Sequence, residues 1–151
     1  MKSFTKPHDN LGGVLKVWAI PPSVVSVSGN TLSFTSTIDI VEMYATAETL
    51  NANVKTKRSG AGVSFDIEIS GSMPRPSLTD QGNIDFLMQR RWMVLIEDGN
   101  NEFIFYGVPQ NERLKFDTEQ DTGKTTADKN SLNFRFSGSV TRNSLIVSNP
   151  F

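Results

Sequence analysis

Apolar and polar residues alternate with a period of two along most of this chain. Successive side chains of a β-strand point to opposite faces, so this spacing predicts strands with one face packed and the other wet, as in antiparallel sheets. Turn signals rich in Gly, Pro and Asn separate the alternating segments. The segments with the clearest alternation are Val25–Val27, Leu32–Phe34, Ile38–Ile40, Phe65–Ile69, Leu114–Phe116 and Leu132–Phe136.

The clearest single unit is a hairpin. The runs Trp92–Glu97 and Glu102–Tyr106 flank the turn sequence Asp98-Gly-Asn-Asn, which predicts two paired antiparallel strands.

One segment departs from the alternation. From Ser77 to Arg91 the apolar residues recur at helical spacing, with Ser77 or Asn83 as the N-cap, so we expect one short helix there.

Strands before and after a single helix predict an all-β fold, an antiparallel β-sandwich or open barrel with one short flanking α-helix. With 151 residues, we expect a single domain over residues 1–151, in which residues 1–10 form a flexible N-terminal arm. We expect at least seven strands. Val41–Leu50 suits a strand or a helical turn, and a strand is favoured. The residues expected in the core are Phe65, Ile67, Ile69, Leu95, Phe134 and Phe136.

Composition removes several kinds of chemistry. The chain has no cysteine, which excludes disulfides, thiolate nucleophiles, zinc–thiolate sites and iron–sulfur clusters. Lys and Arg total 15 against 16 Asp and Glu, for a net charge of −1, so no global positive field favours nonspecific nucleic-acid binding. No segment approaches the roughly 20 apolar residues that span a bilayer. We expect no cofactor, and neither a membrane nor a specific nucleic acid as partner.

The N-terminal segment Met1–Asn10 carries positive charge but lacks the apolar run of a secretory signal. We therefore expect a natural full-length product that begins at Met1, is made in the cytoplasm and is not exported by that route.

Candidate catalytic groups are few. His8 is the only imidazole, and its place in the N-terminal arm is typical of a solvated residue rather than of a base in a catalytic triad. Asp66 and Glu68 share a strand face at a spacing that a glycosidase pair could use. The apolar residues on the opposite face favour a different interpretation, the wet face of an amphipathic strand. We expect no enzyme activity and assign no catalytic residue.

Two charged segments suggest binding. Asp117–Asp128 partly imitates a calcium loop, but its glycine falls at position seven and its last ligand is Asp instead of Glu. A solvated acidic loop is favoured, and cation binding is left open.

Lys55–Gly62 is the densest basic stretch and is placed at a turn. It lacks phosphate-loop spacing and neighbouring aromatic residues, which favours a protein contact or solvation over nucleic acid.

Two stretches resemble a known family. The first is Asn10–Pro21, and the second runs from the hairpin Arg91–Gly107 through Asp121–Lys124 and Ala127–Asn130 to Leu132–Gly138. They resemble the opening, the hairpin and the closing strands of small structural proteins encoded in phage and prophage modules of Bacteroidetes-type bacteria. Ser36–Pro76 matches nothing in that family. The resemblance implies a virion structural role, in a tail tube or a head-to-tail connector, where β-sandwich subunits with one flanking helix form rings. It brings no catalytic residues.

We therefore expect a noncatalytic virion structural subunit that assembles into homo-oligomeric rings, contacts other virion proteins and passes from the bacterial host cytoplasm into the virion. Loops of opposite charge on one chain suit a head-to-tail interface. The candidate interface residues are Lys55, Lys57, Arg58, Asp117, Glu119 and Asp121. The rival hypothesis is a carbohydrate-binding or adhesive β-sandwich module with exposed aromatic platforms at Trp18, Tyr44 or Tyr106. A third hypothesis is a hydrolase on a jelly-roll scaffold.

Overall fold

The computed structural model describes residues 13–46, 48–74, 78–107, 112–121 and 131–151, and within these ranges it has eleven strands and one helix. The strands of the N-terminal half are β1 (Val14–Ile20), β2 (Val25–Ser28), β3 (Thr31–Phe34), β4 (Val41–Met43), β5 (Asn51–Ser59) and β6 (Gly62–Pro74). Helix α1 (Leu78–Met88) is followed by β7 (Arg91–Asp98), β8 (Phe103–Tyr106), β9 (Leu114–Asp121), β10 (Ser131–Val140) and β11 (Leu145–Val147).

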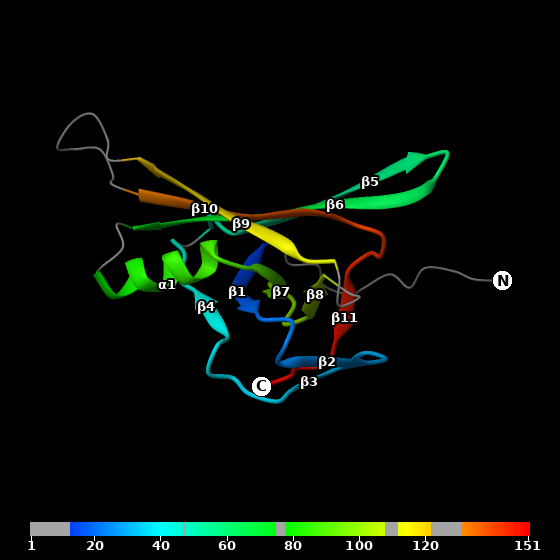
Figure 1. Ribbon diagram of the computed structural model, residues 1–151, viewed down its shortest axis with the longest axis horizontal. Helices are drawn as coiled ribbons and strands as arrows, with labels where there is room; N and C mark the ends of the chain where they lie inside the picture. Colours follow the sequence, from blue (N-terminus) through cyan, green and yellow to red (C-terminus); the bar gives the residue numbers. More distant parts are fainter. Residues whose placement is uncertain (1–12, 47, 75–77, 108–111, 122–130) are drawn as a thin grey trace.

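The strands form two packed layers (Figure 1). The upper layer has the order β9-β10-β6-β5, and the lower layer contains β4, β1, β7, β8 and β11. All pairs are antiparallel. Strand β7 joins the layers, because one of its edges pairs with β1 while the other pairs first with β9, through Arg91 and Trp92, and then with β8. The all-β fold with one short helix is therefore confirmed.

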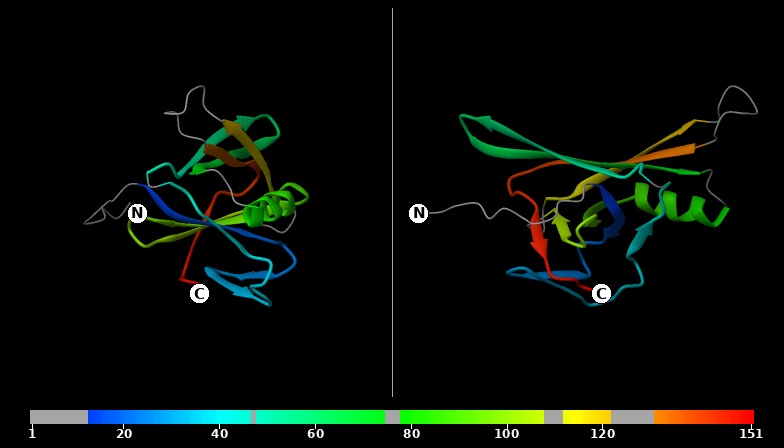
Figure 2. Two further views of the ribbon diagram at one scale, coloured as in Figure 1. Left: turned by 90° about the vertical axis from the view of Figure 1, so that its left-hand side faces the viewer. Right: turned by 180° about the vertical axis from the view of Figure 1, so that it is seen from behind.

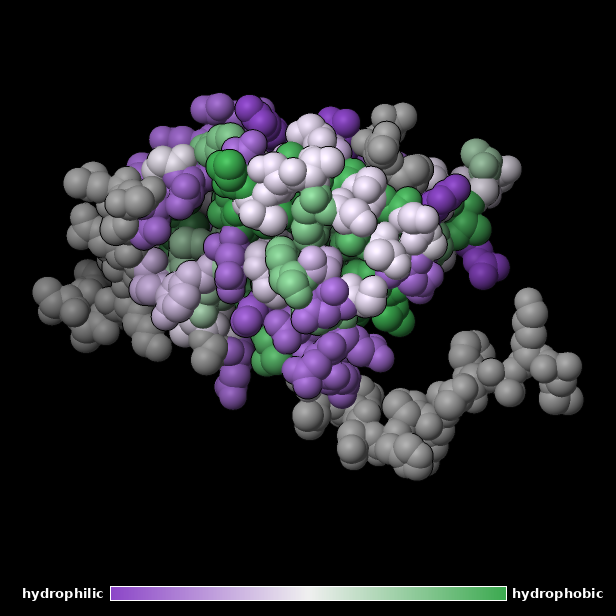
Figure 3. Space-filling view, turned by 90° about the horizontal axis from the view of Figure 1, so that it is seen from below, coloured by the Kyte–Doolittle hydropathy of each residue, from purple (hydrophilic) through white to green (hydrophobic). Residues whose placement is uncertain are grey.

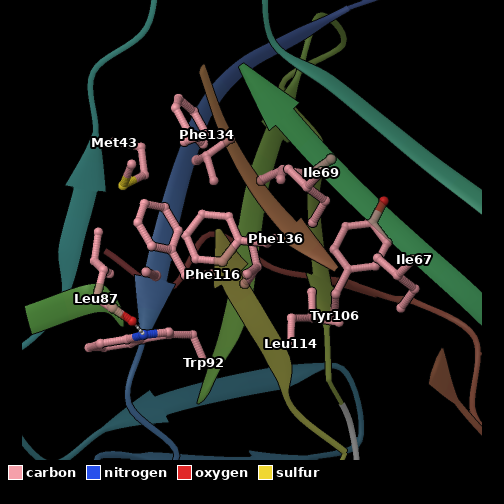
Figure 4. Packing of buried hydrophobic residues seen from close by; sticks show 14 of the residues in the cluster. Met43, Ile67, Ile69, Leu87, Trp92, Tyr106, Leu114, Phe116, Phe134 and Phe136 are labelled. Carbon is pink, nitrogen blue, oxygen red and sulfur yellow. Dashed lines mark hydrogen bonds between the residues drawn. The ribbon is translucent and has the colours of Figure 1, made fainter. Parts of the chain in front are cut away.

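The main core lies between the two layers (Figure 4). Alternate residues of the upper strands point into it, among them Ile67, Ile69, Phe134 and Phe136, which are at most 2% exposed. A second cluster lies on the other side of the lower layer, where the β2–β3 hairpin covers it (Figure 2). The lower sheet is consequently buried on both faces, and β7 is apolar without interruption from Trp92 to Ile96.

Helix α1 lies at one end of the space between the layers and is held by a side chain from the next strand. Ile84 and Leu87 are buried against the core. The indole Nε1 of Trp92 donates a 2.7 Å hydrogen bond to the carbonyl oxygen of Leu87, in the last turn of the helix. The helix ends at Met88, earlier than the predicted Arg91, and Asn83 lies inside it and is not its N-cap. The alternative N-cap Ser77 lies outside the described residues.

The β7–β8 hairpin forms as predicted. In its turn, the Asp98 carboxylate accepts hydrogen bonds from the backbone nitrogens of Asn100 and Glu102, both at 2.9 Å. This side chain therefore satisfies backbone donors that the sharp reversal leaves without strand partners.

Three local predictions need correction or refinement. Ile38–Ile40 is not a strand. These residues form a turn in which the backbone N–H of Ile40 donates a hydrogen bond to the carbonyl oxygen of Thr37, and Ile38 is 90% exposed. Phe65 is only partly buried, because β6 extends beyond the lower layer at that end. Among the described residues of Val41–Leu50, only Val41–Met43 is a strand. The predicted arm, residues 1–10, lies outside the described residues.

Candidate functional site

The outward side of the upper layer is a polar surface with residues from four strands. Its members alternate with the core residues of the same strands, and the strand register places them in adjacent rows. We call it the polar face, and its members are Asn53, Lys55, Lys57, Ser64, Asp66, Glu68, Ser70, Ser72, Asn133, Arg135, Ser137, Ser139, Lys115, Asp117 and Glu119. The opposite side of the molecule, seen from below in Figure 3, has apolar side chains interspersed with polar ones.

The six candidate interface residues lie in strands, not in loops as predicted. Lys55, Lys57 and Arg58 belong to β5, whose pairing with β6 continues to the tight turn at Gly60 and Ala61. Asp117, Glu119 and Asp121 belong to β9, which pairs with β10 from Lys115 to Asp121. The reason is that the charged residues on the outward side alternate with inward-facing ones such as Val54 or Phe116, while Arg58 directly follows Lys57 in the exposed end of β5. Polar side chains can therefore occupy the wet face without ending the strand.

The strand order places these two charged groups at opposite edges of one four-stranded sheet. Within the described residues, β5 pairs with β6 alone, so its other edge is open. Strand β9 pairs with β10 from Lys115 to Asp121 and with β7 only through Leu114 and Lys115. Within the described residues its edge from Phe116 onward therefore has no strand partner, and helix α1 packs against part of β9. One edge thus carries Lys and Arg, and the other carries Asp and Glu.

Some of these charges are already paired within the chain. Lys57 forms an ion pair with Asp66 across the β5–β6 ladder, and Lys115 Nζ lies 2.7 Å from Asp117 Oδ1 along β9. The hydrogen bond from Lys57, followed by one from Ser139, lowers the pKa of Asp66 below its ordinary value.

Other charges at the edges have no such partner. Among the described residues, no salt bridge involves Lys55, Arg58 or Glu119. All three side chains are exposed, so they are available to groups outside the chain.

Two shallow hollows lie along the polar face. One, of about 360 Å³, is lined by Ser70, Ser72, Asn133 and Asp117 among others. The other, of about 320 Å³, includes Lys55, Asp66 and Glu68 in its lining. Most residues that line both hollows carry hydroxyl, amide or charged groups, so this surface offers partners for polar and water-mediated contacts.

The carboxylates that the sequence offers for catalysis or metal binding have ordinary surroundings. Asp66 pairs with Lys57, and Glu68 lies 4.0 Å from Arg135, as expected on a wet strand face. Within the described part of the chain, no three His, Asp or Glu side chains gather as a metal site would require. Asp117–Asp121 is a strand. His8 and residues 122–128 of the calcium-like segment lie outside the described residues.

The aromatic platforms of the rival hypothesis are mostly buried. Trp18 packs against Phe103 and Phe151 and is 7% exposed, and Tyr106 is 4% exposed. Burial, with a smaller contribution from the negative charge of Asp98, raises the pKa of Tyr106 to about 12. Tyr44 alone of the three proposed platforms is open to solvent, at 72%. A sugar-binding surface built from this set would therefore rest on a single ring.

Comparison of the chain with protein-family models, with curated proteins and with solved structures found no match. Among the described residues, no helix has the length and apolar character needed to cross a membrane.

Proposed function

We propose that this protein is a noncatalytic structural subunit of a phage or prophage virion that assembles into homo-oligomeric rings, in a tail tube or a head-to-tail connector. The observation that supports this most directly is the opposite charge on the two edges of one sheet. A head-to-tail contact joins two different surfaces of identical chains, so complementary surfaces on one chain are what such an assembly needs.

Two further features agree with this role. Lys55, Arg58 and Glu119 are exposed, and in the described part of the chain no salt bridge occupies them. The family resemblance of the hairpin and closing strands suggests a virion component, which would be assembled in the host cytoplasm and contact other virion proteins. Neither a membrane nor a specific nucleic acid has a part in this proposal.

Sedimentation velocity over a range of protein concentrations tests the proposal. We expect oligomers that grow with concentration. Changing Lys55, Lys57 and Arg58 together to Glu gives two acidic edges and weakens association, and changing Asp117, Glu119 and Asp121 to Lys in the same chain partly restores it. Exposed ion pairs contribute about 0–1 kcal/mol each, so the charge effect is expected to fade at higher salt. A wild type that stays monomeric at every concentration contradicts assembly of the isolated protein.

A further inference from the structure

We propose that the copies join by strand addition: the open edge of β5 in one copy pairs antiparallel with the open edge of β9 in the next, so that the upper sheet continues from subunit to subunit. This inference rests on the proposed self-assembly and deepens it, because it names the interface and its geometry.

Both edges present backbone groups that a strand can use. The nine residues of β5 pair with β6 alone, and Phe116–Asp121 of β9 pair with β10 alone, within the residues that the structure describes. Unpaired N–H and C=O groups along an edge are a template for a further strand. The β5–β6 hairpin also extends past the lower layer, and its tip stands clear of the rest of the molecule (Figures 1 and 2). A neighbouring chain therefore has room beside it.

The direction of the strands suits this contact. Neighbours in the order β9-β10-β6-β5 are antiparallel throughout, and with four strands the two outer ones run in opposite directions. A second copy that is displaced across the sheet, without being turned over, therefore brings its β9 antiparallel to β5 of the first. The polar faces of the two copies then lie on the same side.

The side chains suggest a register. Lys55 and Lys57 of β5 lie on the polar face two residues apart, as do Asp117 and Glu119 of β9. In an antiparallel pair, placing Lys55 opposite Glu119 also places Lys57 opposite Asp117. Directly opposite residues of unlike charge stabilise a strand pair, whereas like charges destabilise it.

Charge also disfavours the symmetric alternatives. Pairing β5 with β5 brings lysines together, and pairing β9 with β9 brings carboxylates together. Like charges therefore disfavour pairing between two copies of the same edge. Lysines on an edge strand commonly prevent unwanted pairing. Here the same lysines prevent β5–β5 pairing but attract the acidic edge, which selects a head-to-tail contact over a two-fold one. The charges choose the partner edge, while backbone hydrogen bonds contribute most of the affinity.

Disulfide cross-linking tests the register, and the absence of native cysteine makes it specific. The test variant combines Lys55→Cys with Glu119→Cys. Within one chain, β5 and β9 are separated by β6 and β10, roughly 14 Å at the usual strand spacing, which is too far for a disulfide. Any bond between positions 55 and 119 therefore joins two copies. The matched control combines Ser139→Cys with Glu119→Cys, because Ser139 is exposed on the same face but belongs to a central strand.

Under mild oxidation we expect the test variant to give a ladder of dimers, trimers and higher multimers on a non-reducing gel, which a reductant abolishes. The control variant is expected to give no ladder. Sedimentation of both variants under reducing conditions separates the two proposals. If oligomers form but the 55–119 variant gives no ladder, or the control gives an equal ladder, strand addition is wrong and the proposal of self-assembly is still supported. Monomers at every concentration overturn both.

Discussion

The indole nitrogen of Trp92, the second residue of β7, donates a 2.7 Å hydrogen bond to the carbonyl oxygen of Leu87, in the last turn of α1. The last carbonyls of a helix have no partner within the helix, and α1 has no basic residue in its last turn. Trp92 is fully buried and contacts the ring of Phe86 edge to face, with centroids 5.3 Å apart. The Trp92 side chain thus caps the C-terminal end of α1 and holds the helix against the core.

Trp92→Phe is expected to destabilise the fold more than Trp18→Phe does. Both changes replace a largely buried indole, but within the described residues only that of Trp92 donates a hydrogen bond. A buried carbonyl left without its donor costs about 1–3 kcal/mol. We therefore expect the free energy of unfolding, measured by urea denaturation, to fall by about that much more for Trp92→Phe. Equal losses in the two variants would show that the hydrogen bond contributes little.

A glycine inside β6 makes room for an aromatic ring of β10. Gly71 lies opposite Phe134 in the ladder, and a Cβ at Gly71 would lie 2.7 Å from Phe134 Cζ and 2.7 Å from Leu50 Cδ2. We expect Gly71→Ala to destabilise the protein by about 1–3 kcal/mol, the usual effect of overpacking. The matched control is Gly82→Ala in α1, where nothing lies within 4 Å. Alanine is expected to stabilise that helix by up to about 1 kcal/mol. Opposite signs in thermal denaturation would support the packing argument, and a neutral Gly71→Ala would contradict it.

The sequence predicts most of the upper layer because one of its faces is wet. Phe134 and Phe136 alternate with Asn133 and Arg135, and the structure buries the first pair and exposes the second. The same rule fails for Ile38 and Ile40, since alternation over three residues does not distinguish a strand from a turn.

The lower layer and the charged edges are harder to predict from the sequence, for two physical reasons. Trp92–Ile96 is buried on both faces, because β2 and β3 cover the far side of its sheet, so its pattern does not say which residue faces which cluster. The position of Lys55 at one edge and Glu119 at the other depends on the strand order, which long-range pairing decides. No local pattern in the sequence contains that order.

The Lys57–Asp66 pair predicts a pH dependence on the acidic side. The pKa of Asp66 is lowered in the folded state. Its carboxylate therefore contributes stability that is fully present at pH values above the ordinary pKa of 3.8. That contribution is lost as the pH falls through the lowered value. Asp66→Asn is therefore expected to lower the melting temperature at neutral pH, and its difference from wild type should vanish in strong acid. Glu68→Gln is the matched control, because Glu68 lies 4.0 Å from Arg135 and its side chain is more exposed than that of Asp66. A constant difference at all pH values would exclude this pair as the cause.

Tyr106 predicts a second transition on the alkaline side. Burial raises its pKa from 10.0 to about 12, which means that the folded state favours the neutral phenol. The resulting contribution to stability is complete below pH 10 and is lost as the pH rises from 10 towards 12. Tyr106→Phe removes the titrating group, so its free energy of unfolding should fall less steeply over that interval than that of the wild type. Tyr44→Phe, at the exposed tyrosine, should leave the wild-type slope in place. If the wild type and Tyr106→Phe lose stability in parallel from pH 10 to 12, ionisation of the buried Tyr106 phenol does not cause the loss of stability in the wild type.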